Sequence, residues 1–145
     1  MITLTTLLTQ LNDQFYSASL AAVPTAMRTE ALRQALGQIN AAFASAYEIS
    51  GLDGAAATSL PESHVFALLL GASAFILDFT IRSRFVGYHD TPAVSEDLIP
   101  WAKTMKEEFD VALDRLRLGE LQEATNAPSF QIPSTPNAYE ESLDA

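Results

Sequence analysis

The chain has 145 residues, no cysteine, 8 basic and 18 acidic side chains, and a formal net charge of −10. This length suits one domain with its own core. The lack of cysteine excludes a disulfide framework, a zinc ribbon and a thiol nucleophile, and an apolar fraction of 48% excludes global disorder. The acidic balance argues against a surface whose main task is to grip phosphates.

The charge is unevenly distributed along the chain. Residues 1–118 carry all 8 basic and 13 acidic side chains, whereas residues 119–145 carry five acidic side chains and no basic one. This last stretch also holds Pro128, Pro133 and Pro136, and proline opposes both long helices and central strands. We therefore predict a helical bundle domain over 1–119 and an extended, acidic, proline-containing tail over 120–145.

Two amphipathic helices are predicted first. Apolar residues recur every three or four positions over about 4–16, where Thr3 can cap the helix. A second helix is predicted over about 26–46, capped by Thr25. It has one apolar stripe, typical of a helix that packs on a core: Leu32, Ala35, Leu36, Ile39, Ala42, Phe43 and Ala46. Glycine-rich turn chemistry follows, so a turn or small hairpin is predicted at 47–58.

The third predicted helix should be the centre of the fold. Ser59 and Glu62 match a capping box, so the helix begins at about 61 and runs to about 86. It is apolar nearly all round from Val65 to Leu77, and this stretch is shorter than the roughly 20 residues that a membrane span requires. We expect a buried helix rather than a span, with Gly71 and the small residues after it allowing close helix approach.

The fourth predicted helix covers about 97–118. Ser95, Glu96 and Asp97 supply a cap and first-turn carboxylates, and Gly119 is expected to end the helix. Its apolar stripe contains Leu98, Trp101, Ala102, Met105, Phe109, Ala112, Leu113 and Leu116. Ion pairs four residues apart are expected for Asp78 with Arg82, Lys103 with Glu107 and Lys106 with Asp110. The predicted fold class is all-α, a bundle of about four helices.

No catalytic, cofactor-binding or metal-ligating constellation is predicted. His89 and Asp90 form a dipeptide that some metal-dependent phosphohydrolases use, with His64 upstream, but this one lies in a turn rather than on an apolar helix. Paired Glu-x-x-His motifs, a phosphate-binding glycine loop, a nucleophile elbow and a dinucleotide fingerprint are all missing from the sequence. We therefore expect no enzyme activity and no cofactor.

The apolar residues of the tail allow two interpretations. The first is a solvated, disordered terminus, which is the usual state of such a segment. The second is a docking element that orders on a partner, because a purely solubilising tail has little use for spaced apolar groups. The candidate partner-docking residues are Phe130, Ile132, Tyr139 and Leu143.

One basic and aromatic grouping lies at the end of the third helix. Arg82, Arg84 and Tyr88 form a candidate interface, but they carry too little positive charge to predict nucleic-acid binding. A solvated helix end is the simpler interpretation. Trp101 lies on the apolar stripe of the fourth helix, so we expect it to pack in the core.

The order of elements resembles head–tail adaptor (connector) proteins of tailed bacteriophages. The resemblance covers about 25–118 and depends on the architecture and on short matching pieces within it. These pieces are ALRQAL at 31–36, YEISG at 47–51, LPE at 60–62 and LLLGASA at 68–74. The N-terminal helix and the length of the acidic tail depart from the family pattern.

The resemblance implies a function without catalysis. Such proteins are virion proteins, made in the host cytoplasm, that assemble below the portal as a homo-oligomeric ring, a dodecamer by family resemblance. The ring joins the portal to stopper or tail proteins and extends the DNA channel, with no sequence-specific DNA binding and no membrane. A terminal extension often docks on the portal, and residues 120–145 occupy that place here.

An alternative from another class is a small cytoplasmic helical module. It would hold an apolar ligand or a partner helix in a concave pocket. The residues expected to line that pocket are Phe66, Leu69, Phe75 and Phe79.

Overall fold

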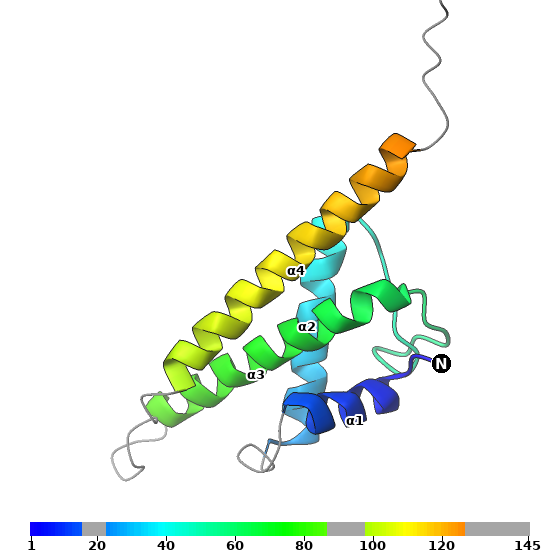
Figure 1. The fold of residues 1–145 in the computed structure, drawn as a ribbon. Coiled ribbons are helices and arrows are strands. Elements are labelled where there is room, and N and C mark those ends of the chain that lie inside the picture. The colour runs from blue at the N-terminus through cyan, green and yellow to red at the C-terminus, as the bar shows by residue number, and fades with distance from the viewer. Residues whose placement is uncertain (16–22, 87–97, 127–145) are drawn as a thin grey trace, which may run out of the picture.

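The chain folds as an all-α bundle, as predicted (Figure 1). The structure is a computed structural model that describes residues 1–15, 23–86 and 98–126. These residues contain no strand. The helices are α1 (Leu4–Phe15), α2 (Thr25–Phe43), the short 3₁₀ helix η1 (Glu62–His64), α3 (Val65–Val86) and α4 (Leu98–Asn126).

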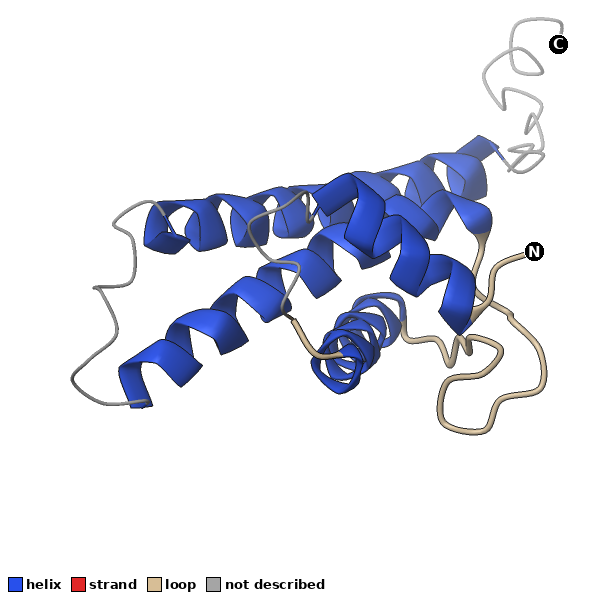
Figure 2. Cartoon of the chain, turned by 90° about the horizontal axis from the view of Figure 1, so that it is seen from below, coloured by secondary structure: helices blue, strands red, loops and turns tan. Residues whose placement is uncertain are grey.

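Helix α3 is the centre of the bundle. It packs against α2 on one side and α4 on another, and α1 covers part of both α2 and α3. Figure 1 shows α3 and α4 running side by side in opposite directions, and Figure 2, turned by 90°, looks along α2 nearly end-on. The side chains of α3 are buried nearly all round, and those that form the core are Ala67, Leu68, Leu69, Leu70, Ala72, Ala74, Ile76 and Leu77.

The apolar character of α3 reflects this central position. The stretch Glu62–Arg82 is long and apolar enough to cross a membrane by length and composition, but 61% of it is buried inside the fold. At Gly71 a Cβ atom would lie 2.7 Å from the Phe109 ring and 3.0 Å from Ala35 Cβ. The expected close approach of helices at the small residues of α3 is therefore confirmed at this position.

The helices begin within four residues of their predicted starts, but of the three capping interactions predicted in the described residues one is correct and two are wrong. Thr3 Oγ1 accepts a hydrogen bond from Thr6 N at 3.2 Å, as a capping threonine does. Thr25 is instead the first residue of α2, and Pro24 before it makes no side-chain cap bond. The capping box is wrong because Ser59 Oγ accepts a hydrogen bond from Glu48 N at 2.8 Å, which removes it from the helix end.

Helix α2 ends three residues before the predicted position. Ala44 adopts a left-handed conformation with φ 49°, which stops the helix at Phe43. Asn40 stabilises this ending, since its Oδ1 accepts a hydrogen bond from Tyr47 N at 2.8 Å and its Nδ2 donates one to Tyr47 O at 3.1 Å. A local side-chain bond thus directs the chain away from the helix axis.

The segment after α2 is a folded loop rather than a hairpin. Its described residues form no strand pair, and Ser50 instead makes one isolated parallel bridge with Thr3. Thr58 Oγ1 accepts a hydrogen bond from Ser50 N at 2.9 Å and donates one to Ile2 O at 2.5 Å. Arg33 of α2 holds the loop from the other side, because its Nε donates to Asp53 Oδ1 at 2.8 Å.

Helix α4 continues past its predicted end. We expected Gly119 to terminate it, but the helix runs through this residue to Asn126. Gly119 does not take a positive φ, which a left-handed C-terminal glycine would require. The next residue, Glu120, is exposed but lies beside His64, with its Oε1 3.6 Å from His64 Nε2. The first residues of the predicted tail, 120–126, are therefore helical, and residues 127–145 lie outside the described residues. The cap expected at 95–97 lies outside them as well.

Candidate functional site

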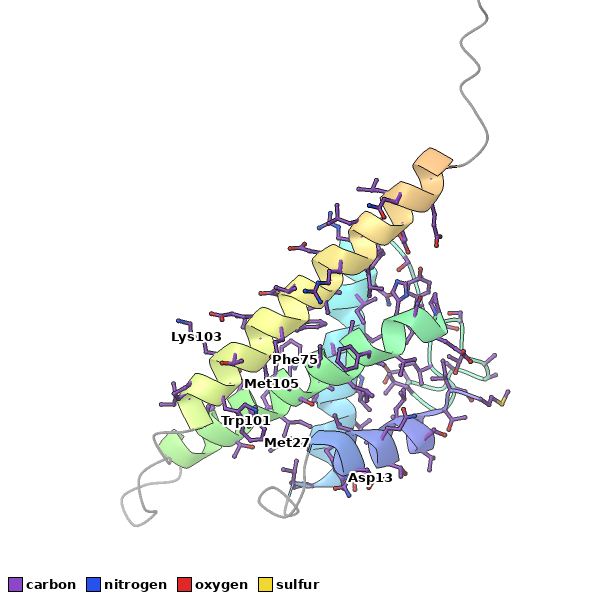
Figure 3. All side chains as sticks on the ribbon, in the orientation of Figure 1. Asp13, Met27, Phe75, Trp101, Lys103 and Met105 are labelled. Carbon is purple, nitrogen blue, oxygen red and sulfur yellow. The ribbon has the colours of Figure 1, made fainter. Side chains whose placement is uncertain are left out.

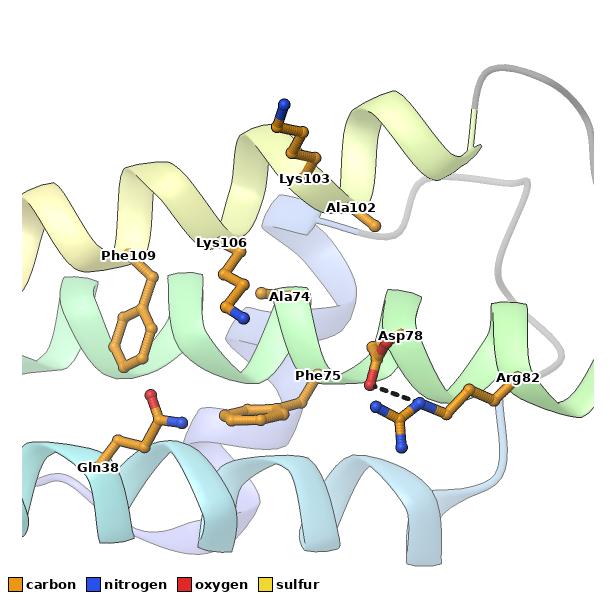
Figure 4. Close-up of a pocket in the computed structure, with 9 residues that line it drawn as sticks. All are labelled: Gln38, Ala74, Phe75, Asp78, Arg82, Ala102, Lys103, Lys106 and Phe109. Atoms are coloured by element: carbon orange, nitrogen blue, oxygen red, sulfur yellow. Dashed lines mark ion pairs between the residues drawn. The ribbon is translucent and has the colours of Figure 1, made fainter.

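A charged hollow lies where α2, α3 and α4 meet. Its volume is about 370 Å³, and Figure 4 shows its walls. We call it the basic hollow, because its lining holds three cationic side chains and one carboxylate. The lining residues are Gln38, Ala74, Phe75, Asp78, Arg82, Ala102, Lys103, Lys106 and Phe109.

The charged groups of the basic hollow are unequally paired. Arg82 Nε lies 3.1 Å from Asp78 Oδ2, which confirms the predicted pair, and Lys103 Nζ lies 3.9 Å from Glu107 Oε1. The predicted pair of Lys106 with Asp110 is wrong, because Lys106 has no ion pair within 4 Å in the described part of the chain, and Figure 4 shows its side chain directed from α4 toward α3. Lys103 points away from the hollow in the same view.

The floor of the basic hollow is apolar. Phe109 is buried, Phe75 is half-buried, and Ala74 and Ala102 complete the surface between the charged groups. Figure 4 shows the Phe75 ring lying beside the Asp78–Arg82 pair. An apolar floor with a mostly cationic rim suits a ligand that is both apolar and acidic.

A second surface feature is an apolar stripe on the outer side of α4. Met105, Phe109 and Leu113 face the core, whereas Val111 and Leu118, seven residues apart, lie on the opposite side. We call the exposed apolar set the second stripe. It consists of Val111, Leu118 and Leu121 of α4, which are 48%, 58% and 64% exposed, together with Phe66 of the neighbouring α3, which is 61% exposed. Phe66 of α3 and Val111 of α4 line one groove of about 450 Å³.

His64 is buried between aromatic rings rather than placed in a reactive site. Its ring makes edge contacts with Phe43 and Tyr47, at centroid distances of 4.8 and 5.6 Å. Nδ1 lies 3.0 Å from Ser63 Oγ, and Nε2 faces Glu120 without a hydrogen bond inside the described ranges. No group of three His, Asp or Glu side chains within those ranges could hold a metal ion. His89 and Asp90 lie outside them.

The structure describes only part of the predicted interfaces. Arg82 lies on the basic hollow, whereas Tyr88 and the side chain of Arg84 lie outside the described residues. The four candidate docking residues of the tail lie outside them as well: Phe130, Ile132, Tyr139 and Leu143.

Two expectations about apolar residues were wrong. Trp101 was expected in the core but is 37% exposed, because the buried stripe passes through Met105, Phe109 and Leu113 and leaves Trp101 at its edge. The residues predicted to line one pocket of a binding module do not lie together in one hollow. Leu69 is buried, Phe66 lies on the groove beside Val111, and Phe75 lies on the separate basic hollow.

The basic hollow was not predicted from the sequence. Its residues come from three helices, and only the pairs at four-residue spacing, such as Asp78 with Arg82, were visible in advance. Fold and surface together define a small all-α bundle with a mixed-charge hollow and an exposed apolar stripe. No protein family model, no curated protein and no solved structure matches the chain.

Proposed function

We propose that this chain is a non-catalytic structural subunit of a bacteriophage neck. It assembles as a ring below the portal, joins the portal to the stopper or tail, and extends the DNA channel. The observation that carries the proposal is the second stripe. A helix that is apolar toward its own core and again on its outer side has a surface that an assembly can bury.

The second stripe is too small to hold two copies together without further contacts. Burying the exposed part of its four side chains would contribute on the order of 1 kcal/mol each. Association of two proteins costs about 4–15 kcal/mol, so this stripe alone would not hold two copies together. A closed ring, in which each copy has two neighbours and a portal above it, combines several such contacts.

The charge of the chain suits a DNA channel. A protein with a net charge of −10 neutralises few phosphates, so DNA would pass without being held. The proposed neck function also predicts that genes for portal and major capsid proteins lie next to the gene for this chain.

Electron microscopy of the full chain with the portal protein encoded beside its gene tests this proposal. We expect rings with an open centre that are seated on the portal. Paired substitution Val111→Glu and Leu118→Glu should abolish the rings, whereas Ala41→Glu on the exposed side of α2 should not. A protein that stays monomeric with the portal, in micrographs and by light scattering, would contradict the proposal.

A further inference from the structure

The basic hollow is unusual on this molecule because its charge opposes that of the chain. The chain carries 8 basic side chains against 18 acidic ones, yet Arg82 and Lys106 lie beside a single carboxylate, Asp78, and Lys103 lies at the rim with its side chain directed away. The side chain of Arg82 is 75% exposed even while paired, so a second anion can reach it. The hollow therefore presents accessible positive charge above an apolar floor.

One segment of the chain has the complementary chemistry. Residues 139–145 read Tyr-Glu-Glu-Ser-Leu-Asp-Ala, with three carboxylates, an aromatic ring and a leucine within seven positions. The ring of Tyr139 suits the apolar floor, and Glu140 and Glu141 suit the cations at its rim. No stretch of seven residues around the other three tyrosines combines three acidic residues with the lack of a basic residue.

We propose that the basic hollow of one copy binds segment 139–145 of a neighbouring copy. This inference rests on the proposed ring, in which adjacent copies lie side by side. It gives each copy a second contact beside the second stripe, and that stripe alone is too small to hold neighbours together. The interaction is an acidic, aromatic peptide in a cationic hollow.

The geometry of α4 favours a neighbour over the same copy. Lys106, whose side chain points into the hollow, and Asn126 lie 20 residues apart on this helix, which corresponds to about 30 Å. Residues 127–138 would have to cover that distance backwards, although a flexible chain of this length has a root-mean-square span of only about 19 Å. Reaching the hollow of the same copy would need about three quarters of the full extension of about 40 Å. Binding to a neighbour's hollow does not require the segment to run back along its own helix.

Disulfide trapping tests the contact, since the chain has no cysteine of its own. Two full-length populations with different tags would be mixed under mild oxidation, one carrying Ser142→Cys and the other Ala102→Cys. Figure 4 shows Ala102 at the wall of the hollow. Ala41→Cys, on the exposed side of α2, is the matched control partner.

We expect the Ser142→Cys copy to cross-link to the Ala102→Cys copy at least about fivefold faster than to the Ala41→Cys control, which is the effect of roughly 1 kcal/mol of local binding. Equal rates would overturn the inference. A chain that carries both Ser142→Cys and Ala102→Cys and closes only on itself would also overturn it, since this result places the segment in its own hollow.

Charge exchange provides a second measurement. The pair Arg82→Glu and Lys106→Glu should reduce the cross-linking rate to that of the control, and adding Glu140→Lys and Glu141→Lys to the partner copy should restore it. Failure of the restoration would contradict a contact through these charges. Rings without cross-linking would overturn this inference and leave the neck function supported, whereas cross-linking without rings would support the inference and contradict that function.

Discussion

At the scale of single residues, the packing of the bundle depends on the absence of a side chain at Gly71. A side chain at this position of α3 would meet both the Phe109 ring of α4 and Ala35 of α2. Helices α2, α3 and α4 therefore approach one another closely at Gly71, where no Cβ separates them. Gly37 of α2 offers a contrast, since a Cβ there would meet nothing within 4 Å.

Replacing these two glycines by alanine should have opposite effects. Gly71→Ala should lower the free energy of unfolding by about 1–3 kcal/mol, because the added methyl overpacks a closed core. Gly37→Ala should raise it by about 0.5–1 kcal/mol, because alanine favours the helix and the site is open. Urea unfolding followed by circular dichroism measures both. Equal changes in the two variants would show that Gly71 is not tightly enclosed.

The contact between Arg33 and Asp53 shifts the pKa of both side chains, and that of Asp53 affects stability at low pH. A hydrogen bond from Arg33, together with the charge of that side chain, lowers the pKa of Asp53 below its usual value of 3.8. A carboxyl with a lowered pKa stabilises the fold when it is ionised, so this contribution is present above the unfolded-state pKa and is lost as the pH falls through the folded-state value. Asp53 also has φ 52°, a left-handed conformation that asparagine accepts.

Asp53→Asn should therefore remove the charge and keep the backbone. The variant should melt at a slightly lower temperature than the parent at pH 7, and the difference should vanish as the pH falls below 3.8. In NMR titration of the parent, the Asp53 carboxyl should titrate below its usual range, and Arg33→Gln should raise its pKa again. A melting difference that persists at low pH would point to backbone strain instead.

At the scale of elements, most helix boundaries were predictable, but two C-terminal ends were not, because α2 stops three residues before and α4 runs eight residues beyond the predicted position. Apolar periodicity placed α1, α2 and α4, and the continuous apolar stretch placed α3, because both patterns are properties of the local sequence. The ends depend on contacts from elsewhere. Ser59 bonds to Glu48 rather than capping a helix, and Glu120 lies beside His64, 56 residues earlier in the chain. Neither partner could be read from the neighbouring residues.

The continuation of α4 gives a test at this scale. Gly119 lies within the helix, with open space where a Cβ would be, so Gly119→Ala should raise the free energy of unfolding by about 0.5–1 kcal/mol and increase the helical signal. If Gly119 instead ended the helix in a left-handed conformation, alanine would be unfavourable there and stability would fall. Circular dichroism with urea unfolding separates the two results, and Gly37→Ala calibrates the gain for an open helical site.

At the scale of the whole molecule, the same arrangement explains the candidate site. The basic hollow exists because α3 and α4 run side by side past α2, so Arg82, Lys106 and Gln38 meet although they are far apart in sequence. The sequence predicted the helices but not their relative rotation, and rotation decides which side chains share a surface. The second stripe was also missed, although the core side of α4 was predicted, because the groove that joins Val111 to Phe66 depends on how α3 and α4 lie together.

Hydrogen exchange across the full chain should follow this architecture. The amides of Leu68–Leu77 lie in the central helix among buried side chains, so they should open only with the whole domain. The amides of 120–126 lie in helical turns whose side chains are mostly exposed, and they should exchange at least about 100-fold faster, which corresponds to roughly 2.7 kcal/mol. Assembly of the proposed ring should slow exchange over 111–121 and leave Leu68–Leu77 unchanged, because the second stripe lies on the outer side of α4. If exchange instead slowed only around α1, the interface would lie on the opposite part of the bundle and the second stripe would not be the surface that neighbouring copies share.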